Sequence, residues 1–464
     1  MIIMPHWQET LVASAPPLPQ FLITPPRQGT GFNGPTCKST PHFNKTSSCP
    51  HVDKTLTVPV MKDLLKQELK DNIFTNVPAM AETIFPDAVL PFPIDDNLLD
   101  NLAGLYDQTN GWVNFPNHKK RKNVPVSVER KFATFFNNVC NALCKINHKN
   151  LAVPKSPSLC PRLWSVEYCQ RPLPGPGPKR KPDIILVDAL AKPGPRSWAD
   201  VLSVWEITTC KLSAGLKDTL LNKAYLTFQS QESRRFVVMT ALCGRGLHIC
   251  MFDRAGACYS EEYQIDSHPK VFLRVLAGLL FAETTTLGFD PTITISGGVK
   301  QVEVTNMYTI HGTIFRSQVI RGRATICWHA TRNGMDYVIK DTWIDTARQT
   351  KHKILNKLQG VEGVPRVVEA KVLTIHGHTD LTDSRRAMFR DLSITCNASD
   401  RQRFKKLENC IHVRLVLEPF TTPIWNFTSK RELLSVLIDI VKGELLYVYI
   451  IPSLLYLPDQ FTNV

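Results

Sequence analysis

The feature that most constrains the fold is an alternation in the middle of the chain, where short apolar runs rich in β-branched residues are separated by longer helical stretches. Runs of this kind predict buried strands, and the stretches between them predict helices. In chain order, we expect strands at 184–188 and 201–208, a helix at 214–230, strands at 236–243 and 247–253, and a helix at 271–282. The sequence therefore predicts a mixed α/β domain that ends near Gly288.

Two further helices are expected upstream of this domain. One covers the segment MKDLLKQELKDNIF at 61–74. The other begins after Ser127, a good N-cap residue, and carries Glu129 in its first turn, where a negative charge is favourable. Apolar residues recur along it at helical spacing and predict one buried face. They are Phe132, Phe136, Val139, Leu143 and Ile146.

The composition is that of a globular protein, because 43% of the 464 residues are hydrophobic and 21% are charged. This excludes a collagen, a coiled coil and a wholly disordered chain. The 13 cysteines are odd in number and lack Cys-x-x-Cys pairs, which argues against a secreted disulfide scaffold. Residues 1–57 are rich in Pro, Ser and Thr and predict a disordered leader. Its metal-type side chains fit no standard zinc finger; they are Cys37, His42, Cys49 and His51.

We expect an intracellular protein without a membrane span. No basic and apolar signal peptide opens the chain, and the apolar stretch Leu445–Leu457 is short for a span and contains Pro452. The net charge of +14 favours weak attraction to polyanions. One basic run fits either a nuclear import signal or a solvated loop. It consists of Lys119, Lys120, Arg121 and Lys122.

A second α/β unit begins at about Thr305. Its expected elements are a hairpin that turns at 321–323, a strand at 335–343, a helix at 346–359, strands at 366–375 and 411–417, and a helix at 429–447 capped by Ser429. This is the order of a protein-kinase N-lobe, in which a backbone turn covers nucleotide phosphates and a strand lysine points at them. Lys340, in Val-Ile-Lys, is the candidate, although such a lysine is common on exposed strands.

A longer stretch of the sequence resembles the fungal-type protein kinase domain family. The residues that carry the resemblance are VIRGRATICWHATRNGMDYVIKDTW and ILNKLQGVEGVPRVVEA, with KPDIILVD, VWEIT, FQSQESRRFVVMTALCGRGLHICMFDRAG and LGFDPTI upstream. It spans roughly residues 60–445, and we expect three parts. These are the leader at 1–57, a helical lead-in with an α/β domain at 58–300, and a kinase-like N-lobe with the start of an incomplete C-lobe at 301–464.

The resemblance implies ATP-dependent phosphorylation of protein Ser/Thr, with ATP and Mg²⁺ as cofactors. It implies a nucleotide site in which Lys340 binds phosphate and Glu418 lies in the hinge between the lobes. The turn over the phosphates would consist of Arg321, Gly322, Arg323 and Thr325.

The chain also departs from the family pattern. Lys351 and His352 stand where a glutamate that pairs with Lys340 is expected, and the end of the chain, VYIIPSLLYLPDQFTNV, has no His-Arg-Asp or Asp-Phe-Gly segment. We therefore expect no catalytic residues, weak or absent ATP and Mg²⁺ binding, and a truncated, inactive pseudokinase.

A second constellation resembles the core of PD-(D/E)xK nucleases. Asp183 opens one strand, Glu206 lies on the next, and a helix with Glu129 precedes them. Two carboxylates on adjacent strands suit a divalent metal, and a lysine two positions after the second would orient the attacking water. Thr208 occupies that lysine position, and the nearest replacement is Lys211. The sequence therefore indicates a remnant of this fold with no functional metal site.

Three functions remain open from the sequence. The first is an inactive kinase-like protein that binds a protein partner or substrate. The second is a nucleic-acid-binding or degenerate nuclease-like module served by the basic loops 119–122 and 179–181. The third is a pseudo-enzyme that acts only through protein partners, and no pattern in the chain specifies an oligomeric state.

Overall fold

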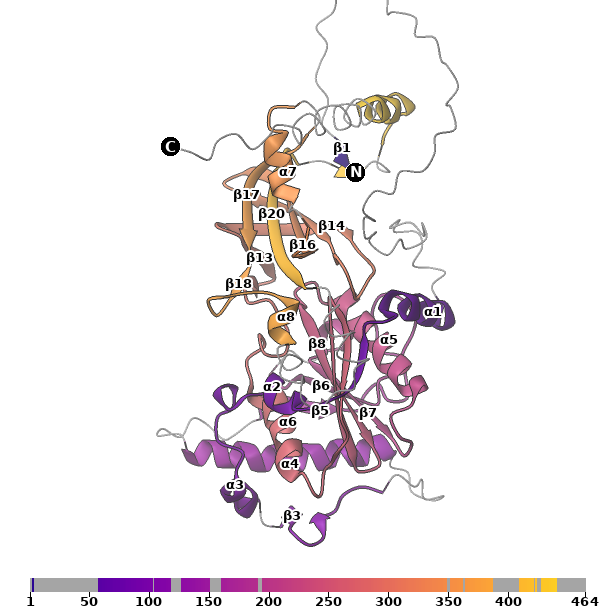
Figure 1. Cartoon of the computed structure of the whole chain (residues 1–464), viewed down its shortest axis with the longest axis vertical. Helices are drawn as coiled ribbons and strands as arrows, with labels where there is room; N and C mark the ends of the chain where they lie inside the picture. The colour runs from indigo at the N-terminus through magenta and orange to yellow at the C-terminus, as the bar shows by residue number, and fades with distance from the viewer. Residues whose placement is uncertain are drawn as a thin grey trace, which may run out of the picture.

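Two large β-sheets, each with its own helices, lie one above the other in the computed structural model (Figure 1). The structure describes residues 2–3, 57–102, 104–117, 127–150, 160–190, 194–348, 351–361, 364–386, 409–420, 422–423 and 427–439. The mixed α/β class predicted from the sequence is confirmed, with a lower unit formed by the upstream half of the chain and an upper unit formed by the kinase-like half.

The lower unit contains α1 (Val58–Leu69), β2 (Ile73–Val77), α2 (Met80–Ile84), η2 (Asp87–Val89), α3 (Asp96–Asn101), β3 (Tyr106–Asp107), β4 (Gly111–Trp112), α4 (Val128–Asn150), β5 (Arg162–Ser165), β6 (Ile184–Asp188), η3 (Trp198–Asp200), β7 (Ser203–Thr208), α5 (Ala214–Ser230), β8 (Phe236–Cys243), β9 (Gly246–Asp253), β10 (Gly256–Ser260), β11 (Tyr263–Gln264) and α6 (Pro269–Phe281). Its sheet has the order β2-β10-β9-β8-β7-β6-β5, with β11 beside β9. Because β7 and β8 are parallel, the chain needs a crossover between them, and α5 supplies it.

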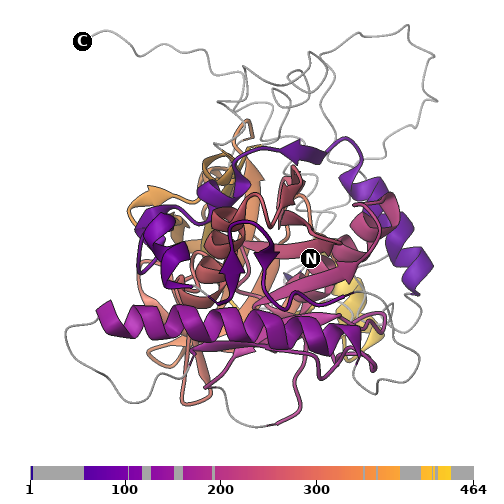
Figure 2. The same ribbon diagram turned by 90° about the horizontal axis from the view of Figure 1, so that it is seen from below.

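Both faces of the lower sheet are covered. On one face α2, α4 and α6 form an apolar core, and Figure 2 shows α4 running across the molecule. On the other face α1 and α5 lie side by side over a second core. The predicted stripe of α4 is buried in the first core, and Oγ of Ser127 caps the helix by accepting from the N–H of Arg130 at 3.2 Å. Alternate residues of β6 and β7 pack into the two cores on opposite faces of the sheet. Both strands are therefore continuous apolar runs in the sequence.

The upper unit contains β12 (Ile293–Ser296), β13 (Val299–Glu303), β14 (Met307–Arg316), β15 (Ile326–Arg332), β16 (Met335–Asp345), α7 (Lys351–Lys357), β17 (Arg366–Val372), β18 (Thr374–Ile375), β19 (His378–Thr379), α8 (Thr382–Arg385), β20 (Cys410–Glu418) and β21 (Thr422–Pro423), which pairs with β1 (Ile2–Ile3). A helix at 430–439 follows. The antiparallel sheet has the order β12-β13-β14-β15-β16-β20-β17. The five strands from β14 onward include the hairpin, the lysine strand and the two strands after the helix, so this part of the sheet fits a kinase-like N-lobe.

Several expectations need correction or lie outside the described residues. The helix expected over 61–74 ends at Leu69, because the chain turns at Asp71 with a φ of 66° and then enters β2. The boundary expected between residues 300 and 301 falls inside β13, so the upper unit begins at β12.

Apart from Ile2, Ile3 and Thr57, the leader lies outside the described residues, as do the basic run 119–122 and the end of the chain from 440. Ser429 caps the helix at 430–439, because its Oγ accepts from the N–H of Glu432 at 3.1 Å. In the described ranges we find no helix with the length and apolar character that crossing a bilayer requires.

Candidate functional site

Lys340 lies in β16 between β15 and β20, where it pairs with Cys327 on one side and Leu415 on the other. Side chains alternate along a strand, so Lys340 shares a sheet face with Val338. Val338 packs in an apolar cluster with Leu355 of α7. Lys340 therefore lies on the sheet face that α7 covers, as a kinase N-lobe requires of its phosphate-binding lysine.

The helix α7, with the sequence KHKILNK, contains no glutamate. In an active kinase a glutamate on the helix after the lysine strand fixes the lysine. The side chains at the two predicted positions, Lys351 and His352, lie outside the described residues. The helix thus packs on the sheet through Leu355 and offers no carboxylate to the lysine.

The turn predicted to cover the phosphates is docked onto the lower unit. Ile320 is 0% exposed and packs in the core beneath α1 and α5. The N–H groups of Ile320 and Arg321 both donate to Oε1 of Glu68 on α1, the first at 2.7 Å. The N–H of Gly322 donates to the carbonyl of Arg254 at 2.8 Å. Three consecutive amides that could face a nucleotide are therefore bound by protein groups.

Two further features hold this turn in place. The guanidinium of Arg254, in the turn after β9, donates to the carbonyls of Val319 and Ile320 at 3.3 and 3.2 Å. Gly322 has a φ of 99°, a conformation that L side chains rarely adopt, so glycine is required here for backbone reasons. Both features fit a fixed turn, whether or not it ever covers a phosphate.

Glu68 is a buried carboxyl group in this contact. Burial raises the pKa of Glu68 to about 7, although the two turn amides and the charges of Arg254 and Arg321 act in the opposite direction. Its Oε1 satisfies two backbone N–H groups of the turn, which would otherwise need another acceptor. No pattern in the sequence pointed to Glu68, because it lies on a distant helix.

Of the remaining predicted nucleotide-site residues, Arg323 and Thr325 contact β16 and Glu418 lies on β20. The carbonyl of Arg323 accepts from the N–H of Trp343 at 2.8 Å, and Oγ1 of Thr325 is 2.9 Å from Oγ1 of Thr342. Glu418 ends β20 and forms an ion pair with Arg366. The structure thus places Lys340 and Glu418 on neighbouring strands, while the turn at 321–325 contacts the far end of β16 and the lower unit.

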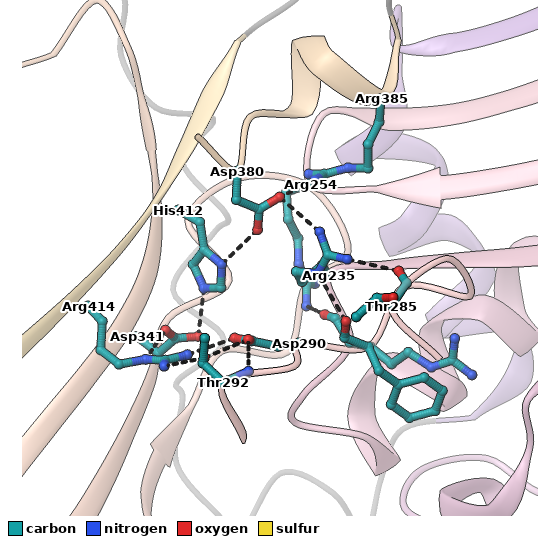
Figure 3. A network of polar contacts seen from close by, with 12 residues as sticks. Arg235, Arg254, Thr285, Asp290, Thr292, Asp341, Asp380, Arg385, His412 and Arg414 are labelled. Atoms are coloured by element: carbon teal, nitrogen blue, oxygen red, sulfur yellow. Dashed lines mark hydrogen bonds and ion pairs between the residues drawn. The ribbon is translucent and has the colours of Figure 1, made fainter. Parts of the chain in front are cut away.

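A buried polar network joins the two units, with His412 of β20 between two carboxylates (Figure 3). Its Nδ1 is 3.0 Å from Oδ2 of Asp380, and its Nε2 is 2.9 Å from Oδ2 of Asp341. Both ring nitrogens face carboxylate oxygens, an arrangement that favours the doubly protonated imidazolium. Burial lowers the pKa of His412, but Asp341 and Asp380 outweigh this effect and raise it to about 9.

Arg414, two residues further along β20, extends the network. It is 0% exposed, and it donates to Oδ1 of Asp341 at 2.9 Å and to Oδ2 of Asp290 at 2.8 Å. Burial would raise the pKa of Asp341, yet Arg414 and His412 hold it well below its usual range. Buried charges persist only when they are paired in this way.

The network then reaches the lower unit. Arg235, directly before β8, donates to Oδ1 of Asp380 at 3.0 Å, and Arg386 donates to Oδ2 of Asp253 at 2.9 Å. No pattern in the sequence singled out Arg235, Asp380 or Arg386. For His412 and Arg414 a signal was present, because they stand at alternate positions within the apolar run CIHVRLVLE.

Asp183 and Glu206 are neighbours in the lower sheet, as expected. The register pairs Ile184 of β6 with Trp205 of β7, which places the two carboxyl groups beside each other. The N–H of Asp183 donates to Oε1 of Glu206 at 3.5 Å, and the N–H of Ile207 donates to Oδ2 of Asp183 at 2.9 Å.

The structure adds a lysine to this pair that the sequence analysis did not find. Lys223 of α5 is 2% exposed, and its Nζ contacts Oε1 of Glu206. Burial raises the pKa of Glu206 to about 7 despite this ammonium group, and burial together with the charge of Glu129 raises the pKa of Asp183. Lys211, the replacement suggested by sequence spacing, is exposed beyond the end of β7.

Within the ranges that the structure describes, no three His, Cys, Asp or Glu side chains are placed to hold a metal ion. His376 and His378 flank the turn between β18 and β19 and are both exposed. Any metal at Asp183 and Glu206 would therefore need oxygen ligands from the backbone, from water or from a substrate, which is how Mg²⁺ is commonly bound.

The fold and the lysine face define a protein with a kinase-like N-lobe packed on an upstream α/β unit. The chain matches the model of the family described as fungal protein kinase over residues 181–448, which is more than half of its length. The chain therefore belongs to the fungal protein kinase family. No curated protein and no solved structure matches it.

Proposed function

We propose that this member of the fungal protein kinase family acts as a pseudokinase, whose N-lobe binds MgATP weakly and transfers no phosphate to protein Ser/Thr. The single observation that carries the proposal is the engagement of the turn amides. Ile320, Arg321 and Gly322 donate their N–H groups to Glu68 and to the carbonyl of Arg254, so they are not offered to a nucleotide.

The physics of phosphoryl transfer supports this proposal. The reaction depends on positioning and on electrostatic stabilisation by fixed donors, a lysine and Mg²⁺. Here Lys340 lies on the sheet face that α7 covers, but α7 contains no glutamate to fix the lysine. The N–H groups of the turn already donate to Glu68 and to the carbonyl of Arg254. Such a lobe has part of a nucleotide site and lacks its positioning elements.

A pseudokinase of this kind would work through contacts with a protein partner. The buried network around His412 and Arg414 supports that role, because it fixes the N-lobe to the lower unit and presents the two as one surface. A partner would then recognise the joined units.

We also propose that the protein is intracellular. The ten cysteines in the described part of the chain are all free thiols, which fits a reducing compartment. Nuclear import through the basic run at 119–122 stays a prediction.

The test is nucleotide binding by the purified full chain, measured by calorimetry with MgATP. We expect no saturation in the micromolar range for the wild type, and tighter binding for Glu68→Ala, because that variant releases two turn amides. Lys340→Met in the Glu68→Ala background should remove the gain. Tight MgATP binding by the wild type, or phosphate transfer to protein that Lys340→Met abolishes, would contradict the proposal.

A further inference from the structure

We propose that Cys144 and Cys160 form a modification site of the lower unit, at which a hydroperoxide oxidises the two thiols to a reversible disulfide bond. The bond would link α4 to the segment that leads into β5. The inference goes beyond the pseudokinase function and does not depend on it. Both cysteines are free thiols in the structure. This is the form expected in a reducing compartment, where disulfides are mostly transient and redox-sensing.

The sulfur atoms of the two cysteines lie within reach of each other. Sγ of Cys144 is 2.7 Å from Sγ of Cys160. A disulfide bond is about 2.05 Å long, so a small rotation of the side chains is enough to form one. The pair thus needs no rearrangement of the backbone before it reacts.

The surrounding contacts hold α4 and β5 together at this point. The side-chain amide of Asn137 on α4 donates to the carbonyl of Trp164 at 2.9 Å and accepts from the N–H of Trp164 at 3.0 Å. The guanidinium of Arg162, at the start of β5, donates to two carbonyls near the end of α6 at 2.7 Å each. Cys144 packs in the apolar core under α4, and Cys160 packs against that core. The fold itself therefore sets the distance between the two thiols.

Their surroundings give the two thiols different roles. Cys144 is 2% exposed, whereas Cys160 is half-buried, so a small oxidant can reach Cys160. The thiol of Cys160 donates to Oδ1 of Asn141 at 3.2 Å, so Cys144 is the donor in the contact between the two sulfur atoms. This hydrogen bond lowers the pKa of Cys160, against the effect of burial, and raises the pKa of Cys144. A partly exposed thiol of lowered pKa reacts first with an oxidant, and a neighbouring thiol then resolves the product.

The reaction balances with a hydroperoxide as the oxidant. The thiolate of Cys160 attacks one peroxide oxygen and the O–O bond breaks, which gives a sulfenic acid on Cys160, while the departing oxygen takes the proton that the thiol lost. The sulfur of Cys144 then bonds to the sulfur of Cys160, and the hydroxyl group leaves as water with the proton of Cys144. The two thiols lose two electrons in all, and the peroxide accepts both. A reducing dithiol opens the bond again by exchange.

The experiment treats the reduced, purified full chain with hydrogen peroxide. The remaining thiols are then alkylated under denaturing conditions, and disulfides are mapped by mass spectrometry. Trypsin places Cys144 in the peptide 132–145 and Cys160 in the peptide 156–162. We expect a cross-link between these two peptides that dithiothreitol removes. Cys140, which shares the first peptide, should be alkylated, because burial raises its pKa to about 12.

Three variants separate the roles of the two thiols. Cys144→Ser should lose the cross-link and accumulate a sulfenic acid at Cys160, which dimedone traps at a level about 10-fold or more above that at Cys169. Cys160→Ser should lose the cross-link and leave Cys144 unlabelled. Cys169→Ser is the matched control and should keep the cross-link, because Cys169 is also half-buried but burial raises its pKa.

The wild type alone decides the main outcome, so the test does not depend on the folding of a variant. The proposal is overturned if the wild type, folded by circular dichroism, keeps the thiols of Cys144 and Cys160 free after peroxide treatment, or if either one is linked to a different cysteine. It is also overturned if dimedone labels Cys160 in Cys144→Ser no more than it labels Cys169.

Discussion

Replacement of His412 by glutamine tests the buried network at the junction of the two units. The pKa of His412 is about 9 in the folded protein, against 6.5 for an ordinary histidine, because two carboxylates flank it. Between these two pH values the folded protein binds about one proton more than the unfolded chain at this position. The free energy of unfolding therefore falls as pH rises through this window, by about 1.4 kcal/mol per pH unit at most and by about 3 kcal/mol in all.

The assay is guanidinium unfolding from pH 6 to 10 for the wild type, for His412→Gln and for a matched control, His378→Gln, whose side chain is exposed. Other groups also titrate here, including Glu68 and Glu206 with pKa values of about 7, but they are common to all three proteins. The difference between the wild type and His412→Gln should therefore be largest below pH 6.5 and shrink towards pH 9. A difference that is independent of pH would refute the doubly protonated ring.

Three further predictions concern stability. Arg414→Met should lower the free energy of unfolding by about 3–5 kcal/mol, because it removes the cation that Asp341 and Asp290 share in the interior. If the loss is smaller than the loss caused by replacing an exposed arginine, the network does not stabilise the fold. Phe136→Ala should cost about 3–5 kcal/mol in chemical unfolding, since the ring is 0% exposed in the core under α4; a loss below about 1 kcal/mol would mean that this face is not packed as described. Gly288→Ala should lower the melting temperature far more than Gly334→Ala. Both glycines have positive φ, but a Cβ at 288 would collide with the carbonyl oxygen of Phe236, whereas a Cβ at 334 meets nothing within 4 Å. Equal losses of melting temperature would contradict the packing at Gly288.

Local sequence patterns predicted most of the regular elements. The strands β6 and β8 and the helix α5 begin and end where the sequence predicts, because most of each element is buried and turn residues flank it. The short strands β5, β10 and β12 were not predicted. Each has only four or five residues, which is too few to show a period of its own, and β10 also depends on pairing with the distant β2.

Candidate site residues could be predicted from the sequence only where their position along a strand indicates their role. Lys340 and the pair Asp183 and Glu206 follow from positions within strands, and the structure places them on the expected strands. Lys223 and Glu68 were missed because their partners lie 17 and 252 residues away, and only the fold brings them together. The turn at 321–325 was read as a local phosphate loop, whereas its conformation depends on contacts with α1 and with the turn after β9.

We conclude that the lower unit holds the kinase-like turn at 321–325 through its backbone amides. Amide hydrogen exchange over residues 318–324, measured by mass spectrometry on the full chain, tests it most directly. We expect slow exchange in the wild type, unchanged by MgATP, and markedly faster exchange in Glu68→Gln, because an amide group replaces the buried carboxylate that accepts two of these N–H groups. Exchange of this segment at the rate of an open loop in the wild type would contradict the claim.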